Sequence, residues 1–261
     1  MSDVVTVELV GHVLLIGVNR PEKLNSFNLA TIDAFAAAYQ HLADTDEARV
    51  AVVFGHGKHF SAGLDLAEVG PAVAERGPQA LAGDYDYDPF GVWKPQVPKP
   101  VVLALSGYAY TLAIELALSA DIVVAAQGTR FAQLEIARGI MPFGGATFRA
   151  PAQLGWGNAM HFLLTADEFD AEQAHRIGLV QEVVPDGTQV ERATAIAERI
   201  AAQAPLGVRA TLANARVARD DGPAAAVAHL QASLPPILTS ADAVEGVMSF
   251  VERRPATFQG R

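Results

Sequence analysis

The sequence predicts an α/β fold in which strand–strand–helix units repeat before an all-helical C-terminal region. Two observations carry this prediction. Short β-branched runs typical of strands alternate with stretches of helical spacing up to about residue 184. From Gln189 to the end, by contrast, the apolar residues follow helical spacing throughout. With 261 residues and 51% hydrophobic side chains, the chain can bury a large core without disulfides.

The first half of the chain begins with a predicted hairpin, because two strand-like segments flank Gly11. A polar loop, an amphipathic helix, a β-branched strand and a glycine-rich turn follow. The stretch from Gly70 to Pro100 is rich in Gly, Pro and Asp and is expected to be irregular; so long a loop is usually functional or mobile. The elements before it are expected as strands at 4–9 and 12–18, a loop at 19–25, a helix at 29–42, a strand at 49–54 and a turn at 55–63.

The second half alternates again and then becomes helical. A second extended piece reaches Glu135, the residues from Pro142 to Gly145 form a turn, and helices follow to about Gly178. Prolines are expected to divide the C-terminal helices, at Pro205, Gly222-Pro223 and Pro235-Pro236. The other elements are expected as a strand at 101–106, a helix at 111–119, strands at 121–126 and 179–184, and helices from 189.

The composition excludes several classes of function. The absence of cysteine removes disulfides, thiolate zinc sites and a cysteine nucleophile, and agrees with the reducing cytoplasm in which we expect the protein. A formal charge of −10 argues against a nucleic-acid surface. The N-terminus lacks the basic region of a signal peptide. The apolar stretch from Val101 to Ala120 is broken at Gly107, so we expect a strand, a turn and a buried helix rather than a membrane span.

Two glutamates lie in apolar surroundings. Glu115 is in a helix with apolar residues on every side, and Glu135 follows a short strand-like segment. A buried carboxylate is costly unless it is paired or hydrogen-bonded, and two of them beside turns are often used for proton transfer. The alternatives are a solvent-facing Glu115 and a structural ion pair of Glu135 with Arg130 or Arg138.

A small-residue turn, from Phe60 to Leu66, follows an apolar strand and opens a predicted helix, so its backbone N–H groups can meet an anion. Within it, Asp65 could equally be a carboxylate placed at a helix start by the helix dipole. The common cofactor motifs are absent: there is no Walker loop, no His-Glu-x-x-His and no Gly-x-Ser-x-Gly, and Gly155-Trp-Gly157 lacks a preceding strand. His56 and His59 are expected to be plain loop residues.

In combination, these segments resemble the enoyl-CoA hydratase/isomerase, or crotonase, superfamily. The resemblance rests on the turn at 60–66, on residues 107–122 around Glu115, and on Glu135 with the Pro-x-Gly-Gly turn that ends at Gly145. The loop at 19–25 and the segment at 250–255 also match, so the resemblance covers essentially the whole chain in order.

The resemblance implies a crotonase (ClpP-like) spiral of ββα units at residues 1–190. A helical region at 191–261 would mediate oligomerisation and complete the CoA site. It implies an enoyl-CoA hydratase, a hydro-lyase that converts trans-2-enoyl-CoA to 3-hydroxyacyl-CoA without a metal or other cofactor, since the CoA thioester is the substrate. The expected partners are acyl-CoA and further copies of the chain, as a trimer or a dimer of trimers, with no nucleic acid and no membrane.

The family's functional positions carry over onto particular residues. Glu115 and Glu135 match the pair that holds a water, delivers its hydroxyl to C3 and supplies a proton to C2. The backbone N–H groups of Leu64 and Leu112 match the oxyanion hole that polarises the thioester carbonyl. The positions that contact CoA or substrate correspond to Lys23, Ala62, Asp65, Leu66 and Arg253, the last often reaching a neighbouring subunit in relatives.

One departure from the family leaves alternatives open. Thr111-Leu112-Ala113 stands where hydratases usually have three glycines, and Leu134 replaces a frequent proline. A backbone donor needs no particular side chain, but Thr111 and Leu112 add bulk at the thioester site. A double-bond isomerase, which needs Glu135 but not Glu115, and a non-catalytic acyl-CoA-binding homologue both remain possible readings. A dienoyl isomerase is disfavoured because its extra carboxylate would fall near Phe143.

Overall fold

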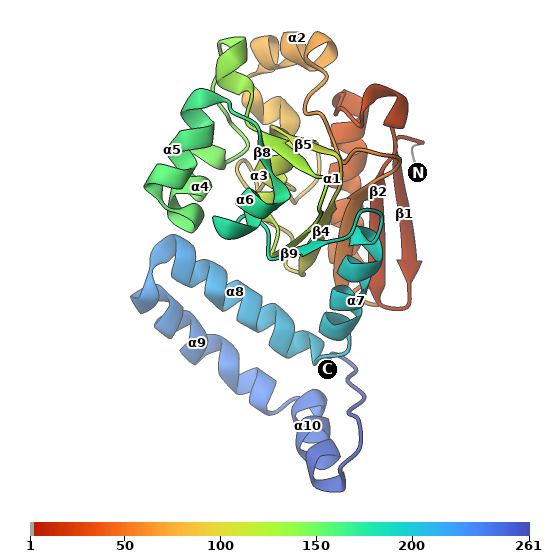
Figure 1. The fold of residues 1–261 in the computed structure, drawn as a ribbon. Coiled ribbons are helices and arrows are strands. Elements are labelled where there is room, and N and C mark those ends of the chain that lie inside the picture. The colour runs from red at the N-terminus through yellow and green to blue at the C-terminus, as the bar shows by residue number, and fades with distance from the viewer. Residues whose placement is uncertain (1–2) are drawn as a thin grey trace.

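A mixed sheet lies at the centre of the molecule (Figure 1). The computed structural model describes residues 3–261, and within that range six strands pair in the order β1-β2-β3-β4-β6-β9. β1 and β2 form the predicted hairpin around Gly11, whereas the later pairs are parallel. The strands are β1 (Val5–Val10), β2 (Val13–Val18), β3 (Val50–Gly55), β4 (Val101–Leu105), β6 (Ile122–Ala126) and β9 (Glu182–Val184).

A second, smaller sheet leads from the central sheet toward the two glutamates. It is formed by β5 (Tyr108–Tyr110), β7 (Arg130–Ala132) and β8 (Phe169–Asp170). Ser61 joins this sheet: its N–H donates to the carbonyl of Tyr108 (2.9 Å) and its carbonyl accepts from the N–H of Tyr110 (3.0 Å). The turn after β3 and the segment that ends at Thr111 therefore lie side by side.

Helices cover both faces of the central sheet. The side chains of β3 alternate, so that Val50 and Val52 face one helical layer and Ala51 and Val53 face the other. The layer on the Ala51 side includes α1 (Leu29–Asp44), which starts where the Asn28 side chain accepts a hydrogen bond from the N–H of Thr31, and α3 (Leu112–Ser119). The opposite layer is α7 (Gln189–Ala201). The first helix of the predicted C-terminal region thus packs on the sheet; the division at residue 190 stays a prediction.

The last three helices extend away from the sheet as a tail (Figure 1). They are α8 (Pro205–Asp221), α9 (Pro223–Leu238) and α10 (Ala241–Glu252). Pro205 and Pro223 start helices as predicted, because a proline in the first turn forfeits no intrahelical hydrogen bond. The expectation that Pro235-Pro236 divides two helices is wrong: both prolines lie in the last turn of α9, which ends at Leu238.

The region from 70 to 100 was expected to be irregular, yet it begins inside a helix, α2 (Leu66–Arg76). A helix was expected to open at the turn 60–66, but Gly70 and Pro71 obscured how far it continues. The helix buries Val69 and Ala72 on one face, and a single proline removes only one backbone bond. A short 3₁₀ turn, η2 (Pro78–Leu81), follows. The remaining elements are α4 (Ala146–Leu154), α5 (Trp156–Thr165), α6 (Ala171–Arg176), η1 (Pro21–Lys23) and η3 (Glu135–Arg138).

The apolar stretch from Val101 to Ala120 forms β4, β5 and α3, as the glycine at its centre predicted. Within residues 3–261, no helix has both the length and the apolar character needed to cross a membrane.

Candidate active site

Glu115 is buried in the first turn of α3, where its side chain is only 4% exposed. One carboxylate oxygen, Oε1, accepts hydrogen bonds from the N–H groups of Gly144 (2.7 Å) and Ala146 (3.2 Å). Burial, together with the charge of Glu135, raises the pKa of Glu115 to about 7, although both backbone donors oppose the shift. The side chain therefore does not face solvent, and a proton can join or leave it near neutral pH.

The turn from Pro142 to Gly145 reaches Glu115 because it contains glycine. A Cβ added at Gly144 would collide with the carboxylate and Cβ of Glu115. Only a residue without a side chain can bring its backbone N–H so close. The predicted Pro-x-Gly-Gly turn thus holds the Glu115 carboxylate in place.

Glu135 begins the short turn η3 and is 8% exposed. Its Oε1 accepts a hydrogen bond from Nε2 of Gln133 (3.0 Å), whereas its Oε2 is buried and has no partner among the described residues. Burial raises the pKa of Glu135 to about 7. Arg130 instead lies near Glu168 and Asp170, and no ion pair of Glu135 is formed within residues 3–261. The structural pairing weighed from the sequence is therefore not what holds this residue.

Both glutamates line one narrow cavity of about 20 Å³, and Glu135 also lines an adjoining cavity of about 130 Å³. The narrow cavity has room for about one water molecule. The two cavities share Leu64, Glu135 and Phe143. The narrow cavity is otherwise lined by Phe27, Ile32, Leu81, Phe90, Trp93, Leu112, Glu115 and Gly144; the wider one by Ala62, Leu66, Thr111, Leu134, Arg138 and Ile140.

Leu64 and Leu112 bring two backbone N–H groups to these cavities. Leu64 follows Gly63, whose carbonyl accepts from the N–H of Phe27, and Leu112 is the first residue of α3. Neither N–H has an acceptor within residues 3–261. Both residues line the narrow cavity beside the glutamates. Two unsatisfied donors at one cavity are able to hold a carbonyl oxygen on which negative charge develops.

The structure brings only some of the predicted CoA-contacting residues to the cavities. Ala62 and Leu66 line the wider cavity, and the exposed Lys23 is nearby, because the carbonyl of Leu24 accepts from the N–H of Ala62 (2.9 Å). Asp65 precedes α2 but makes no side-chain capping bond; its carboxylate lies 3.5 Å from Arg20. Arg253 ends α10, at the far end of the tail from α2, so one chain does not bring it to the cavities (Figure 1).

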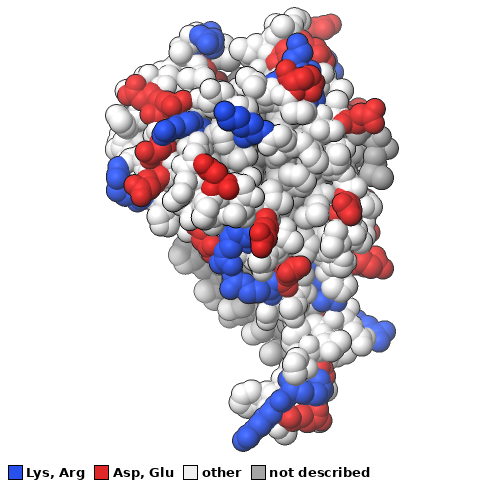
Figure 2. Space-filling view, turned by 45° about the vertical axis from the view of Figure 1, so that its right-hand side comes forward, with Lys and Arg blue, Asp and Glu red and all other residues white. Residues whose placement is uncertain are grey.

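Basic side chains are scattered over one face of the molecule. On the face shown in Figure 2, Lys and Arg stand singly or in small groups among Asp and Glu. Arg138 lines the wider cavity, and Lys23 and Arg20 are on the adjacent loop. From the sequence, Arg138 was expected only as a possible partner of Glu135.

Asp88, which the sequence analysis missed, shapes the wall of the narrow cavity. It is fully buried, and its carboxylate accepts hydrogen bonds from the N–H groups of Phe90, Val92 and Trp93 (2.9–3.0 Å). These bonds fold the loop so that Phe90 and Trp93 face the glutamates. The only sequence signal was Asp88-Pro89, a dipeptide that favours turns.

Arg149, which was also missed from the sequence, connects the loop folded by Asp88 to the turn that holds Glu115. Its buried guanidinium donates to the carbonyls of Phe90 (2.6 Å) and Gly91 (2.9 Å) and lies against Gly145. A buried arginine usually marks a structural or functional contact because leaving its charge unpaired is costly. Its position four residues after Gly145 did not reveal this role, since its partners are about 59 residues away.

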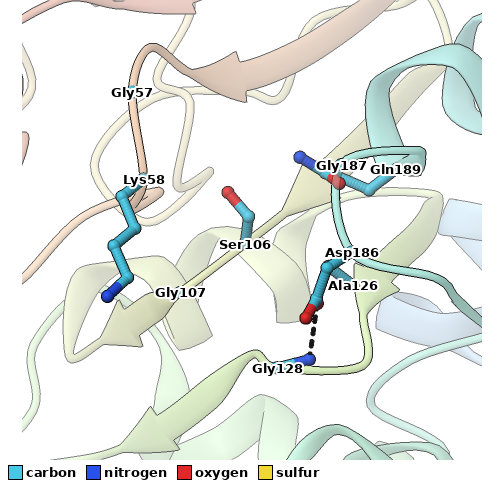
Figure 3. Close-up of a pocket in the computed structure, with 9 residues that line it drawn as sticks. All are labelled: Gly57, Lys58, Ser106, Gly107, Ala126, Gly128, Asp186, Gly187 and Gln189. Atoms are coloured by element: carbon cyan, nitrogen blue, oxygen red, sulfur yellow. Dashed lines mark hydrogen bonds between the residues drawn. The ribbon is translucent and has the colours of Figure 1, made fainter.

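A separate cavity of about 300 Å³ lies where the chain leaves β3, β4 and β6 and enters α7 (Figure 3). Its lining includes Lys58, Ser106 and Asp186, whose carboxylate accepts from the N–H of Gly128 (2.8 Å). It contains none of the predicted site residues. Within the described residues, no three His, Cys, Asp or Glu side chains are arranged to hold a metal ion.

Comparison with known proteins identifies the family and agrees with the fold. Residues 8–261 match the family model for enoyl-CoA hydratase/isomerase. The chain is 33% identical to a carnitinyl-CoA dehydratase of Salmonella typhi, over the whole of both chains. Its structure superposes on a probable enoyl-CoA hydratase/isomerase from Mycobacterium abscessus with a TM-score of 0.93, 48% identity and 99% coverage of both chains. It also superposes on an enoyl-CoA hydratase from Mycobacterium tuberculosis H37Rv with a TM-score of 0.90, 34% identity and full coverage of both. The chain has the crotonase fold and belongs to the enoyl-CoA hydratase/isomerase family.

Proposed function

We propose that this protein adds water to the double bond of a trans-2-enoyl-CoA to give a 3-hydroxyacyl-CoA. The observation that carries the proposal is the pair of buried carboxylates, Glu115 and Glu135, each with a pKa raised to about 7, on one narrow apolar cavity. Groups with such pKa values exchange protons efficiently near neutral pH. The relatives named as dehydratases support the proposal, because removal of water is the reverse of its addition.

In the proposed reaction the thioester oxygen accepts hydrogen bonds from the N–H groups of Leu64 and Leu112. Glu115 acts in its ionised form, which its two backbone hydrogen bonds favour, and takes a proton from a water molecule whose oxygen bonds to C3. The electrons of the double bond move toward the thioester oxygen, and the enolate that forms is stabilised by the two donors. Protonated Glu135, whose Oε2 lacks a partner, delivers its proton to C2. Proton exchange between the two carboxyl groups restores the starting state.

CoA would bind along the loops that carry Lys23 and residues 62–66. We propose no metal or further cofactor, since the thioester itself supplies the electrophilic carbonyl. An arginine suits phosphate well, but Arg253 is at the tip of the tail, so it could reach the CoA site only of a second copy. The tail agrees with assembly, because α9 and α10 expose many large apolar side chains: Val227, Leu230, Leu234, Leu238, Val244, Val247, Met248, Phe250 and Val251. We propose a homo-oligomer, a trimer or a dimer of trimers, formed through this tail.

Double-bond isomerisation is the second candidate, and one observation favours it. The Glu115 carboxylate is already engaged by two backbone donors and could be purely structural, whereas Glu135 has an unpartnered oxygen and could shuttle a proton between C2 and C4 by itself.

The test is the conversion of paired 2-enoyl and 3-enoyl CoA esters by wild type, Glu115→Gln and Glu135→Gln. For a hydratase we expect each substitution to lower hydration by about 10²–10⁴-fold, the usual scale of acid–base assistance. Any weak isomerisation should persist in Glu115→Gln and disappear in Glu135→Gln. A wild type that isomerises well, hydrates poorly and is indifferent to Glu115→Gln is an isomerase. Binding of CoA esters without any turnover would identify a non-catalytic acyl-CoA binder.

A further inference from the structure

Thr111 has a backbone conformation that a threonine rarely adopts. It precedes α3 with φ 52° and ψ −109°, in the region that favours glycine. A β-branched residue is especially disfavoured there, and such strain persists only where the surrounding structure enforces it, most often at functional sites. Glycine would occupy this position without strain, so the threonine side chain needs a reason to be present.

The hydroxyl of Thr111 carries a second cost. Its Oγ1 is buried and has no hydrogen-bond partner within residues 3–261. Buried hydroxyls in proteins are normally paired, because an unpaired one loses its hydrogen bonds to water and gains nothing in return. A ligand that brings an acceptor to this position would remove the cost.

The hydroxyl belongs to the residue before one unsatisfied backbone donor and lies against the residue before the other. A Cβ added to Gly63 would collide with Oγ1 of Thr111, so the threonine side chain rests directly on this glycine. The residue after Gly63 is Leu64 and the residue after Thr111 is Leu112, the owners of the two N–H groups that lack acceptors. Thr111 also lines the wider cavity together with Leu64 and Glu135.

We propose that the Thr111 hydroxyl donates a third hydrogen bond to the thioester oxygen held by the Leu64 and Leu112 N–H groups. The inference rests on the proposed use of a CoA thioester. The methyl and hydroxyl groups of threonine are similar in size, so rotation about the Cα–Cβ bond to another staggered position can move Oγ1 away from Gly63. We propose that this rotation, on binding of the thioester, brings Oγ1 to the cavity that Thr111 lines. A third donor would add to the stabilisation that the two backbone N–H groups give to negative charge on the thioester oxygen.

Three substitutions separate the hydroxyl from the bulk and the strain. Thr111→Val keeps the shape and the β-branch but removes the donor, Thr111→Ser keeps the donor, and Thr111→Gly removes both the donor and the strain. We expect Thr111→Val to lower kcat by about ten- to a hundredfold, somewhat less than the loss of a backbone oxyanion donor, with KM changed less than threefold. Thr111→Ser should stay within about threefold of wild type.

A spectroscopic readout makes the test independent of turnover. The absorption of a cinnamoyl-CoA thioester moves to longer wavelength when its carbonyl is polarised. We expect the shift on binding to be full in wild type and Thr111→Ser, and smaller in Thr111→Val and Thr111→Gly. If the valine variant does not fold, the shift in Thr111→Gly still tests the inference, because this variant relieves the strained conformation and also lacks the hydroxyl.

Two results would overturn the inference: an unchanged shift and kcat in Thr111→Val, or equal losses in the valine and serine variants, which would indicate packing alone. If cinnamoyl-CoA binds with a shift that depends on the hydroxyl but no enoyl-CoA is hydrated, the inference stands and the hydratase proposal fails. If no CoA thioester binds, both are wrong.

Discussion

The two carboxylates of the site are held in different ways. Glu115 lies on a regular helix and is gripped by backbone donors from a turn about 30 residues away, where Gly144 touches its side chain. Glu135 lies on a single 3₁₀ turn and is held by one side chain, that of Gln133, with its second oxygen unpartnered. Both are buried and both have a pKa of about 7.

This difference divides the work between the two groups. Backbone donors cannot rotate, so Glu115 is fixed in place, as a group that positions and activates water requires. The two hydrogen bonds offset part of the cost of ionising this buried carboxyl, although its pKa is still raised. Glu135 is restrained only at one oxygen, which leaves the other free to carry a proton to the substrate. The two roles can be tested by removing, in separate variants, the contacts that hold Glu115 and those that hold Glu135.

The largest effect is expected from Gly144→Ala. The new methyl group would displace the Glu115 carboxylate, because the space that it needs is already filled by that side chain. We expect hydration to fall by about 10²–10³-fold, close to the loss in Glu115→Gln, while binding of a saturated acyl-CoA persists. Steady-state kinetics and calorimetric binding measure the two quantities.

Gly157→Ala is the matched control, because a Cβ at this position in α5 meets nothing within 4 Å. It should retain full activity. Wild-type rates in a folded Gly144→Ala protein would show that the precise placement of Glu115 does not matter for the reaction.

The sequence predicts those parts of the site that depend on residue patterns within one segment, and not those that depend on contacts between distant segments. The burial of Glu115 was predictable, because Leu112, Ala113, Leu116 and Leu118 leave no polar face on its helix. The unpaired N–H groups of the turn at 60–66 followed from its position before a helix, whereas the pair Leu64 and Leu112 was assigned through the resemblance to the family. The roles of Gly144, Asp88 and Arg149 were not predictable from residue patterns, since each acts through contacts with backbone that loops or tertiary packing bring near.

The same limit applies to the fold. The β-branched run at 49–54 and the helical spacing of 29–42 each arise within one element and were sufficient to place β3 and α1. The start of α2 after the turn at 60–66 was predicted, but its extension to Arg76 was missed because Gly70 and Pro71 disfavour a helix locally. The burial of Val69 in the core outweighs that preference.

A smaller effect, on stability, is expected from Glu115→Gln. The folded protein holds the pKa of Glu115 near 7 instead of its ordinary 4.5, so the ionised form is destabilised by folding. Stability is therefore lost as the pH rises from about 4.5 to about 7, and stays low above that. The glutamine variant does not titrate, so its free energy of unfolding should gain on wild type by up to about 3 kcal/mol over this range.

Chemical denaturation at pH 5, 6, 7 and 8 measures this difference, with the exposed Glu75→Gln as control. A gap between wild type and Glu115→Gln that does not change with pH would mean that Glu115 titrates as an ordinary carboxylate and is not tuned for proton transfer.

The smallest effect, and the one that decides the roles of the two groups, is expected from Gln133→Met. Methionine fills similar space but cannot donate the hydrogen bond to Oε1 of Glu135, a bond that lowers the pKa of this carboxyl. The pKa of Glu135 should therefore rise further above its ordinary value. If Glu135 is the acid that protonates C2, it then stays protonated to higher pH, and the alkaline limb of the kcat/KM profile moves upward while the acid limb stays in place. At neutral pH the looser side chain should cost about tenfold in kcat, and Gln127→Met, on an exposed turn, should cost nothing. An acid limb that moves upward instead would assign Glu135 as the base and Glu115 as the acid, because a base must lose its proton before it can act.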